Sequence, residues 1–394
     1  MDVTFDAQRM LHEAERRTGL ADWGGEGWHE ADFRRYFAAL AHSLEREAGF
    51  HTRGRAAAHA RVMNMLCGRL RVVEDRKRLP GLAEGEIRRP IIALGMPRAG
   101  STFLHGLLAQ DPASRAPYTW EIMFPSPPPE RAGFWNDPRI GECEAAMQQQ
   151  GWMREDLQKI HPFDARLADE CGFIYEYSGV GYYHAYWNLP TYTALAAAAD
   201  YVPILQIHRR FLQHLQYRNA GERWVLKAPG AIGFLDALFA VYPDICVIQN
   251  HRDPIKTIPS IASNFVELRR TFSDAPLDPR EFAMLNIGSF GAPIPKVIEF
   301  RRRPGMAARF FDCHFVDMVS DPIAMARRIY GHFGLALSDE AEARMRDWLI
   351  HDQHTKGSRH RYRLEDYGLT EADIERHFGT YLDHYGVQRE RGGA

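Results

Sequence analysis

The sequence has few cysteines and almost no net charge. Its five cysteines are odd in number, widely spaced and never in a C-x-x-C pair, which argues against a disulfide framework and against a zinc site. Lys and Arg (49) nearly balance Asp and Glu (51), so no global field favours nucleic acid or an anionic membrane. We therefore expect no metal, no nucleic-acid partner and a reducing compartment.

The sequence also lacks a long apolar run. No stretch reaches the roughly 18 apolar residues that a membrane span needs. The start, MDVTFDAQRMLHEAERR, has no basic region followed by an apolar segment. We expect a soluble, cytoplasmic protein without a membrane span.

The remaining pattern predicts an α/β fold with a helical N-terminal part. Residues 5–85 alternate apolar and charged positions at helical spacing, so residues 1–88 are expected to form a helical addition. Residues 89–394 are expected to form an α/β domain, packed with these helices in one compact unit. Its parallel sheet, of the phosphate-loop type, would have helices on both faces; the expected strands are 90–95, 224–227, 244–250 and a strand near ARFFDCHF.

A glycine-bearing turn follows the first expected strand. Residues 95–103, GMPRAGSTF, match the phosphate-binding pattern G-x-x-x-x-G-K-[ST], except that Ser101 replaces the lysine. The N–H groups of residues 98–102 would lie at the N-terminus of the next helix, where an anion is favoured. Because that lysine contacts the β- and γ-phosphates of nucleoside triphosphates, its absence argues against ATP hydrolysis. Arg98 and Thr102 can still serve another phosphate.

A second polar segment, VIQNHRDPIKTIPS (247–260), also joins an expected strand to a helix. Strand ends on one edge of such a sheet line the ligand crevice. His-Arg-Asp occurs in protein kinases too, but the Asn expected there is Ile258 and no D-F-G follows. Arg252 and Ser260 can instead hold one phosphate between a guanidinium and a hydroxyl.

Together, the two segments resemble the nucleotide signatures of sulfotransferases that use 3′-phosphoadenosine 5′-phosphosulfate (PAPS). The resemblance extends from about residue 90 to 335 and implies PAPS as co-substrate, PAP as product and no metal. The implied nucleotide ligands are Arg98, Ala99, Gly100, Ser101, Thr102, Arg252 and Ser260. The PR-x-G-[ST]-T form is closer to the bacterial and tyrosyl-protein branch than to the cytosolic branch, which has Lys at the position of Arg98.

Sulfuryl transfer to a hydroxyl needs a base near the acceptor. Glu121 follows the phosphate-loop helix and a short expected strand, and the resemblance to the tyrosyl-protein branch implies that it is this base. Its neighbours Trp120 and Phe124 are expected to desolvate it and make it more basic. Alternatively, Glu121 pairs with an arginine such as Arg98 and holds the loop. Two histidines, which need no such tuning, are rival bases: His161 and His184.

Positive charge is also needed near the bridging oxygen of the leaving group. Lys227 ends the strand WVLK at the same sheet edge as Gly95 and Arg252, so it is expected to join Arg98 in that role. The alternative is an ordinary surface lysine.

A late basic segment, HTKGSRHRYR, resembles the loop that closes over the nucleotide in the family. The resemblance implies nucleotide contacts from Lys356, Gly357 and Arg359. The alternative is a solvated run of charged residues.

Aromatic residues are dense from 173 to 192, and apolar rings with polar tips suit a pocket for an aromatic or lipophilic alcohol. A domain core or a dimer face would use them equally well, and a homo-oligomer is compatible with the sequence. The expected acceptor-pocket residues are His161, Tyr175, Tyr183, His184 and Trp187.

These observations predict a PAPS-dependent sulfotransferase that acts on a hydroxyl of a small aromatic or lipophilic acceptor, by in-line transfer with a general base. Two alternatives stay open. One is a non-catalytic nucleotide-binding protein of the same fold. The other is a small-molecule kinase with an altered phosphate loop.

Overall fold

The computed structural model describes residues 3–160, 163–351 and 363–390, which form two compact units. Unit 1 comprises Met1–Ile87, Pro117–Ala220 and Glu267–Pro276. Unit 2 comprises Arg88–Ala116, Gly221–Val266 and Leu277–Ala394. Unit 2 begins close to the boundary expected after residue 88, while unit 1 also takes two later segments. The expected division into a helical addition and one α/β domain stays a prediction.

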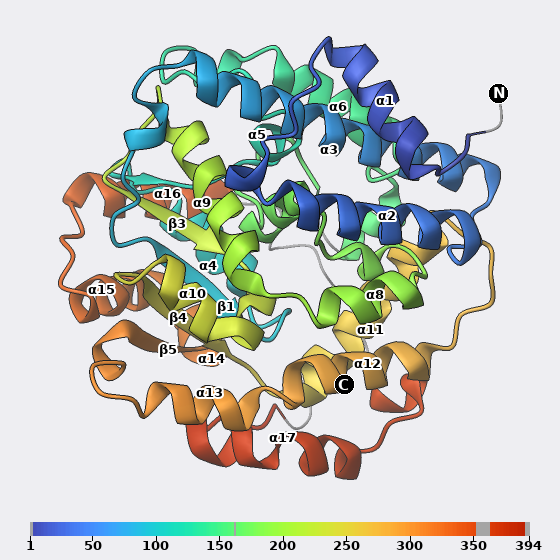
Figure 1. Ribbon diagram of the computed structural model, residues 1–394. Coiled ribbons are helices and arrows are strands. Elements are labelled where there is room, and N and C mark those ends of the chain that lie inside the picture. Colours follow the sequence, from blue (N-terminus) through green and yellow to red (C-terminus); the bar gives the residue numbers. More distant parts are fainter. Residues whose placement is uncertain (1–2, 161–162, 352–362, 391–394) are drawn as a thin grey trace. The chain divides into compact units, whose positions relative to one another are not determined.

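Unit 2 contains a sheet of five parallel strands in the order β2-β3-β1-β4-β5 (Figure 1). The strands are β1 (Ile91–Gly95), β2 (Ser114–Arg115), β3 (Arg223–Lys227), β4 (Cys246–His251) and β5 (Phe310–His314). Every residue of β1 is buried, as a central strand covered on both faces requires. Because β1 pairs with β3 and β4, the carboxyl ends of these three strands meet at one edge of the sheet.

The helices of unit 2 are α4 (Ser101–Leu108), α10 (Leu235–Val241), α11 (Pro254–Arg270, whose last residues belong to unit 1), α12 (Pro279–Gly291), α13 (Ile294–Arg301), α14 (Phe315–Ser320), α15 (Pro322–His332), α16 (Asp339–His351) and α17 (Glu371–Tyr385). A 3-10 turn, Pro229–Phe234, leads directly into α10.

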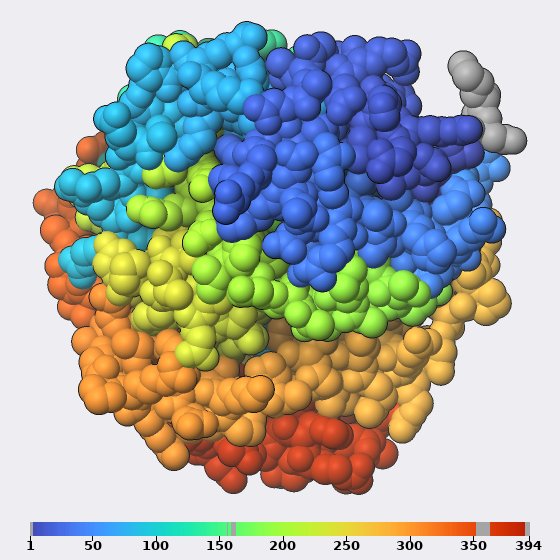
Figure 2. Space-filling model, viewed as in Figure 1, coloured from blue at the N-terminus to red at the C-terminus, as the bar shows by residue number. Residues whose placement is uncertain are grey.

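Helices cover both faces of the sheet. On one face, α4, α15 and α16 pack against Ile91, Val225 and Ile248. On the other face, α10 and α13 contribute Phe239 and Phe300, whose rings contact Phe310 of β5. The α/β fold with a parallel sheet between helices is thus confirmed. Helices α13 and α17 lie side by side on the surface of unit 2, in orange and red (Figure 2).

Unit 1 is helical. Its helices are α1 (Ala7–Thr18), α2 (Glu30–Arg46), α3 (Thr52–Arg78), α5 (Thr119–Met123), α6 (Arg139–Gln149), α7 (Glu155–Ile160), α8 (Pro190–Ala197) and α9 (Tyr201–Gln216). The guanidinium of Arg69, on α3, is fully buried and donates to the carbonyl oxygens of Trp23, Trp28 and Tyr177. It therefore joins the N-terminal helices, which precede the first strand as expected, to the aromatic segment.

Candidate functional site

The loop between β1 and α4 requires glycine at two positions. Gly95 has a φ of 123°, and a Cβ there would lie 2.7 Å from the carbonyl oxygen of Asn250. Gly100 has a φ of 84°, and a Cβ there would lie 2.3 Å from the side chain of Met318. Positive φ favours glycine at both places, and at Gly95 the backbone of β4 leaves no room for a side chain. The loop therefore runs tightly between β4 and α14 before α4 begins.

Helix α4 begins at this loop with its N-terminus free of a side-chain cap. Gly100 is the N-cap, and its carbonyl oxygen accepts the bond from the N–H of Leu104 at 3.0 Å. In an α-helix the N–H groups of the first turn have no intrahelical partner. Together with the helix dipole, the N–H groups around Ser101 and Thr102 favour an anion at this end of α4.

The two segments that are expected to bind phosphate meet at Arg98. Its Nε donates to Oγ of Ser260 at 3.0 Å, and its carbonyl oxygen accepts a hydrogen bond from Nη1 of Arg252 at 3.0 Å. Arg98 also has a φ of 67°, which is uncommon for a residue with a side chain. The structure thus brings Arg98, Arg252 and Ser260 together, whereas their contact with a nucleotide stays a prediction.

Lys227 ends β3 and is buried, with 2% of the residue exposed. Its Nζ donates to Oγ1 of Thr102, on the first turn of α4, at 3.2 Å. No carboxylate of the described residues lies within ion-pair distance of this ammonium. A buried cation is costly without an opposite charge, so its position at the phosphate loop suits a ligand that supplies one. The alternative of an ordinary surface lysine is wrong.

Arg252 follows β4, and its guanidinium contacts a carboxylate, a carbonyl oxygen and an aromatic ring. Nε and Nη2 donate to the two carboxylate oxygens of Glu390, at 2.9 and 3.1 Å. The guanidinium also lies over the ring of Phe315, 3.7 Å from its centroid. Its backbone N–H donates to the hydroxyl of Tyr381 at 3.3 Å. Arg252 therefore presents its charge in a fixed orientation.

A polar network supports the end of β4 behind Arg252. Asp312 accepts from both Nη atoms of Arg301, at 2.6 and 2.7 Å, and lies 2.8 Å from Nε2 of His251. Burial alone would raise the pKa of Asp312, but the hydrogen bonds from Arg301 and His251 hold that pKa well below its usual range. Burial also lowers the pKa of His251, against the opposing effect of Asp312. The network fixes the strand from which Arg252 projects.

Glu121 lies on α5 of unit 1 and is fully buried. Its Oε2 accepts the backbone N–H of Tyr118 at 3.0 Å, which is one half of a capping box at the start of α5. This bond fixes one carboxylate oxygen. The role of Glu121 as a base stays a prediction.

The aromatic segment forms part of the interior of unit 1. Tyr175, Tyr183 and Trp187 are almost completely buried, and the last two rings stack with centroids 5.4 Å apart. Burial and the nearby charge of Arg269 lower the pKa of His184 to about 4. Such a histidine is neutral at pH 7, and its role as the rival base stays a prediction. Acceptor contacts of these residues stay predictions.

Four of the expected site residues lie outside the described residues: His161, Lys356, Gly357 and Arg359. Two residues that contact the guanidinium of Arg252 were not anticipated from the sequence. Phe315 directly follows β5 at the same sheet edge, so the rule that located Arg252 could have found it. Glu390 has no local pattern that would have revealed it.

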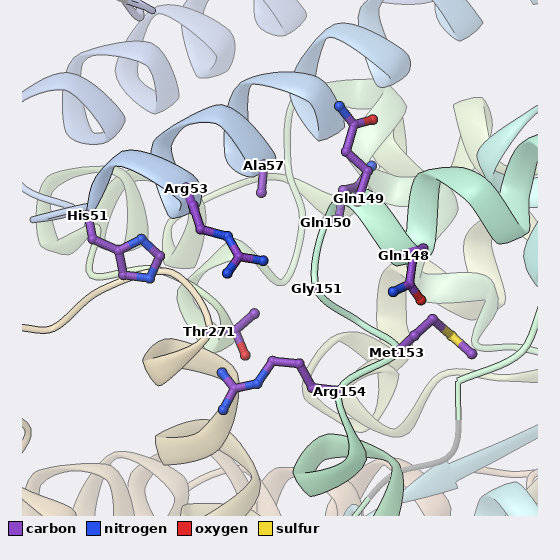
Figure 3. A pocket seen from close by; sticks show the side chains of 10 residues that line it. All are labelled: His51, Arg53, Ala57, Gln148, Gln149, Gln150, Gly151, Met153, Arg154 and Thr271. Carbon is purple, nitrogen blue, oxygen red and sulfur yellow. The ribbon is translucent and has the colours of Figure 1, made fainter.

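Unit 1 also contains a cavity of about 430 Å³ between the start of α3, the end of α6 and the segment after it (Figure 3). Arg53 points into this space, and Arg154 and Thr271 border it. As far as the described residues form its lining, the lining contains no carboxylate, so the cavity favours an anion over a cation. None of the expected acceptor residues within the described ranges lines it.

Among the helices of the described residues, none is both long and apolar enough to cross a membrane. Nor do three or more His, Cys, Asp or Glu side chains in that part of the chain gather in a way that could hold a metal ion. All five cysteines are buried and free: Cys67, Cys143, Cys171, Cys246 and Cys313.

Comparisons with known proteins identify the family of the chain. The chain is 24% identical to the omega-hydroxy-beta-dihydromenaquinone-9 sulfotransferase Stf3 of Mycobacterium tuberculosis and of Mycobacterium bovis, over 97% of this chain and 96% of each relative. The crystal structure of sulfotransferase STF9 from Mycobacterium avium has a TM-score of 0.86 and 29% identity, covering 99% of both chains. That of STF1 from Mycobacterium tuberculosis has a TM-score of 0.81 and 28% identity, covering 95% of this chain and 98% of STF1. Residues 90–339 match the model of the sulfotransferase family, and the chain therefore belongs to that family.

Proposed function

We propose that this sulfotransferase takes its sulfuryl group from PAPS and transfers it to a hydroxyl of a small lipophilic acceptor. The contact of Arg98 with Ser260 and Arg252 carries this proposal. It joins the loop before α4 to the segment after β4, so one ligand can use both. A ligand with separate anionic groups at its 5′ and 3′ positions would use both segments at once.

The residues present fit such a nucleotide. The N-terminus of α4 and the buried ammonium of Lys227 offer positive charge for a phosphosulfate. Arg252 and Ser260 offer a guanidinium and a hydroxyl for a 3′-phosphate. When bound, PAPS supplies an activated sulfuryl group whose leaving group is a phosphate. Lys227 and Arg98 then stabilise negative charge where it develops on that phosphate.

Glu121 is proposed as the base that accepts the proton of the acceptor hydroxyl. Its carboxylate is buried, and the N–H of Tyr118 orients one of its oxygens. The carboxylate of Glu121 would take the proton. A base positioned in this way contributes typically about 10²- to 10⁴-fold to the rate.

The class of acceptor is proposed from the relatives. Stf3, by its name, acts on a hydroxylated menaquinone, and it matches this chain over nearly its whole length. At 24% identity, the likeness supports a hydroxyl on a lipophilic molecule rather than that particular acceptor.

Calorimetric titration with PAP, 5′-AMP and Mg·ATP tests the nucleotide. We expect PAP to bind about 10- to 100-fold more tightly than 5′-AMP, because charge-assisted hydrogen bonds to the 3′-phosphate are worth about 1.5–3 kcal/mol. Arg252→Ala should erase this difference. The matched control is Arg302→Ala, which removes an exposed arginine of the same unit. A PAP affinity no better than that of 5′-AMP, or tighter binding of Mg·ATP, would overturn the assignment.

Transfer itself is measured with ³⁵S-labelled PAPS and a panel of acceptors. An ω-hydroxylated isoprenoid quinone should accept label, and the same quinone without the hydroxyl should not. A panel in which only sugars or peptides become labelled would contradict the lipophilic acceptor while leaving the use of PAPS intact.

A further inference from the structure

The carboxylate of Glu390 occupies the side of the Arg252 guanidinium that would bind a phosphate. The Glu390 oxygens accept from Nε and Nη2 of Arg252 at 2.9 and 3.1 Å, in the bidentate manner in which arginine binds carboxylates and phosphates. Nη1 donates to the carbonyl oxygen of Arg98. The guanidinium face rests on Phe315. The bidentate edge therefore already has an anionic partner within unit 2.

The backbone places this carboxylate, so the pair is more than a chance meeting of two surface side chains. The N–H of Glu390 donates to Oδ2 of the fully buried Asp253 at 2.7 Å. After α17, the N–H of Val387 donates to the carbonyl oxygen of Leu382 at 3.0 Å. The side chains of Arg252 and Glu390 are only 24% and 21% exposed. Segment 386–390 thus holds the Glu390 carboxylate against Arg252.

We propose that Glu390 is a specificity-determining residue, whose carboxylate competes with the 3′-phosphate of the nucleotide for the Nε and Nη2 edge of Arg252. This inference rests on the proposed function. One guanidinium edge makes one bidentate pair, and two anions that share it repel each other. A 3′-phosphate that takes the edge must therefore displace the carboxylate.

The 3′-phosphate has the means to displace it. A phosphate monoester carries more negative charge than a carboxylate and a third acceptor oxygen. Ser260, held close to Arg252 through Arg98, offers that phosphate a further donor. A nucleotide with a 3′-hydroxyl has no charge to exchange and leaves the carboxylate in place. The exchange lowers the affinity for PAP without lowering the affinity for 5′-AMP, and it gives PAP a competitor that assists its release.

There is also space for the exchange. A cavity of about 190 Å³ in unit 2 is lined by Arg252, Phe315 and Glu390, together with residues 386–388. The carboxylate can swing within this cavity while α17 stays in place. The competition therefore requires only a movement of the Glu390 side chain.

Titration of the full chain with PAP and 5′-AMP tests the inference. Glu390→Gln keeps the shape of the side chain and removes its charge, so PAP should bind about fivefold more tightly, as expected for loss of a competing partly exposed ion pair. The affinity for 5′-AMP should stay unchanged. Asp383→Asn is the matched control, because it removes the same charge from an exposed position on α17 and should change neither affinity.

A double-mutant cycle isolates the contact. In the Arg252→Ala background, Glu390→Gln should have no effect on PAP binding, since the contested guanidinium is gone. Unchanged or weaker PAP binding by Glu390→Gln alone would overturn the inference, because it would mean that the carboxylate is neutral or orients Arg252 for the phosphate. An equal gain for 5′-AMP would overturn it too. If wild-type chain binds PAP no better than 5′-AMP, the proposed function fails instead.

Discussion

Replacing Lys227 with methionine tests whether its buried cation serves the reaction rather than the fold. The ammonium is 2% exposed and has Oγ1 of Thr102, 3.2 Å away, as its hydrogen-bond partner. Removing a charge from water costs several kcal/mol, and one neutral hydroxyl offsets little of this. Methionine keeps the apolar stem and most of the volume. We therefore expect the variant to be at least as stable as the wild type.

The expected loss lies in turnover. Removing one preorganised donor from a developing anion typically costs about 10²–10³ in kcat, or about 2.7–4 kcal/mol. Lys227 brings a full charge to a water-excluded position, so we expect a loss near the upper end, about 10³-fold. PAP affinity should fall by no more than about tenfold, because the N-terminus of α4, Arg98 and Arg252 remain.

Three measurements decide the matter: single-turnover transfer of ³⁵S from PAPS, calorimetric titration with PAP, and urea unfolding. Lys296→Met, at an exposed position on α13, is the matched control and should leave all three unchanged. Equal losses in turnover and PAP affinity would show that Lys227 binds the ground state as strongly as the transition state. A fall in unfolding free energy that parallels the loss of turnover would refute the reasoning outright.

Three further predictions follow from particular contacts. Gly95→Ala should lower the unfolding free energy by about 1–3 kcal/mol and abolish PAP binding, because alanine cannot keep the positive φ and the close approach of the loop to β4. The control Gly331→Ala, which has open space around it in α15, should not destabilise the protein. Equal urea transitions for the two variants would contradict this prediction. Asp312→Asn should flatten acid unfolding: the pKa of Asp312 is depressed in the folded state, so its stabilisation is present above the unfolded pKa of about 3.9 and is lost as pH falls below it. Urea unfolding from pH 7 to 2 should therefore show a smaller loss of stability in the variant, and identical slopes would oppose the role of the network. Glu121→Gln keeps an acceptor for the N–H of Tyr118, so it should fold normally and bind PAP normally while transfer falls by about 10²-fold or more; undiminished transfer would exclude this residue as the base.

Much of unit 2 could be predicted because its signals are local. The apolar runs at 90–95 and 244–250 are short enough for buried strands, and each is followed by polar residues at a strand end. The parallel-sheet rule then places Lys227, Arg98 and Arg252 at one edge, and the structure has them there. These local signals were enough to place the three cations at one edge, whereas their expected role toward a nucleotide came from the family resemblance.

The partners of those cations could not be predicted in the same way. Glu390 lies 138 residues from Arg252, and such a separation leaves no periodicity or motif. The burial of Lys227 with no carboxylate of the described segments beside it is likewise a property of packing, since an apolar strand can end in a lysine that faces water. Aromatic density, finally, is common to a pocket and a core, so residues 173–192 did not reveal that their rings fill the interior of unit 1.

Lys227 and Arg252 have different partners, so we expect them to contribute differently to nucleotide binding. Among the described residues, Lys227 has the hydroxyl of Thr102 and no carboxylate beside it, so an anion that reaches the loop displaces no other anion. Arg252 already has a carboxylate, so a 3′-phosphate gains there only the difference between two anions. It follows that the loop side of the site should supply most of the affinity for the nucleotide. The Arg252 side should supply discrimination, and Glu390 sets how large that discrimination is.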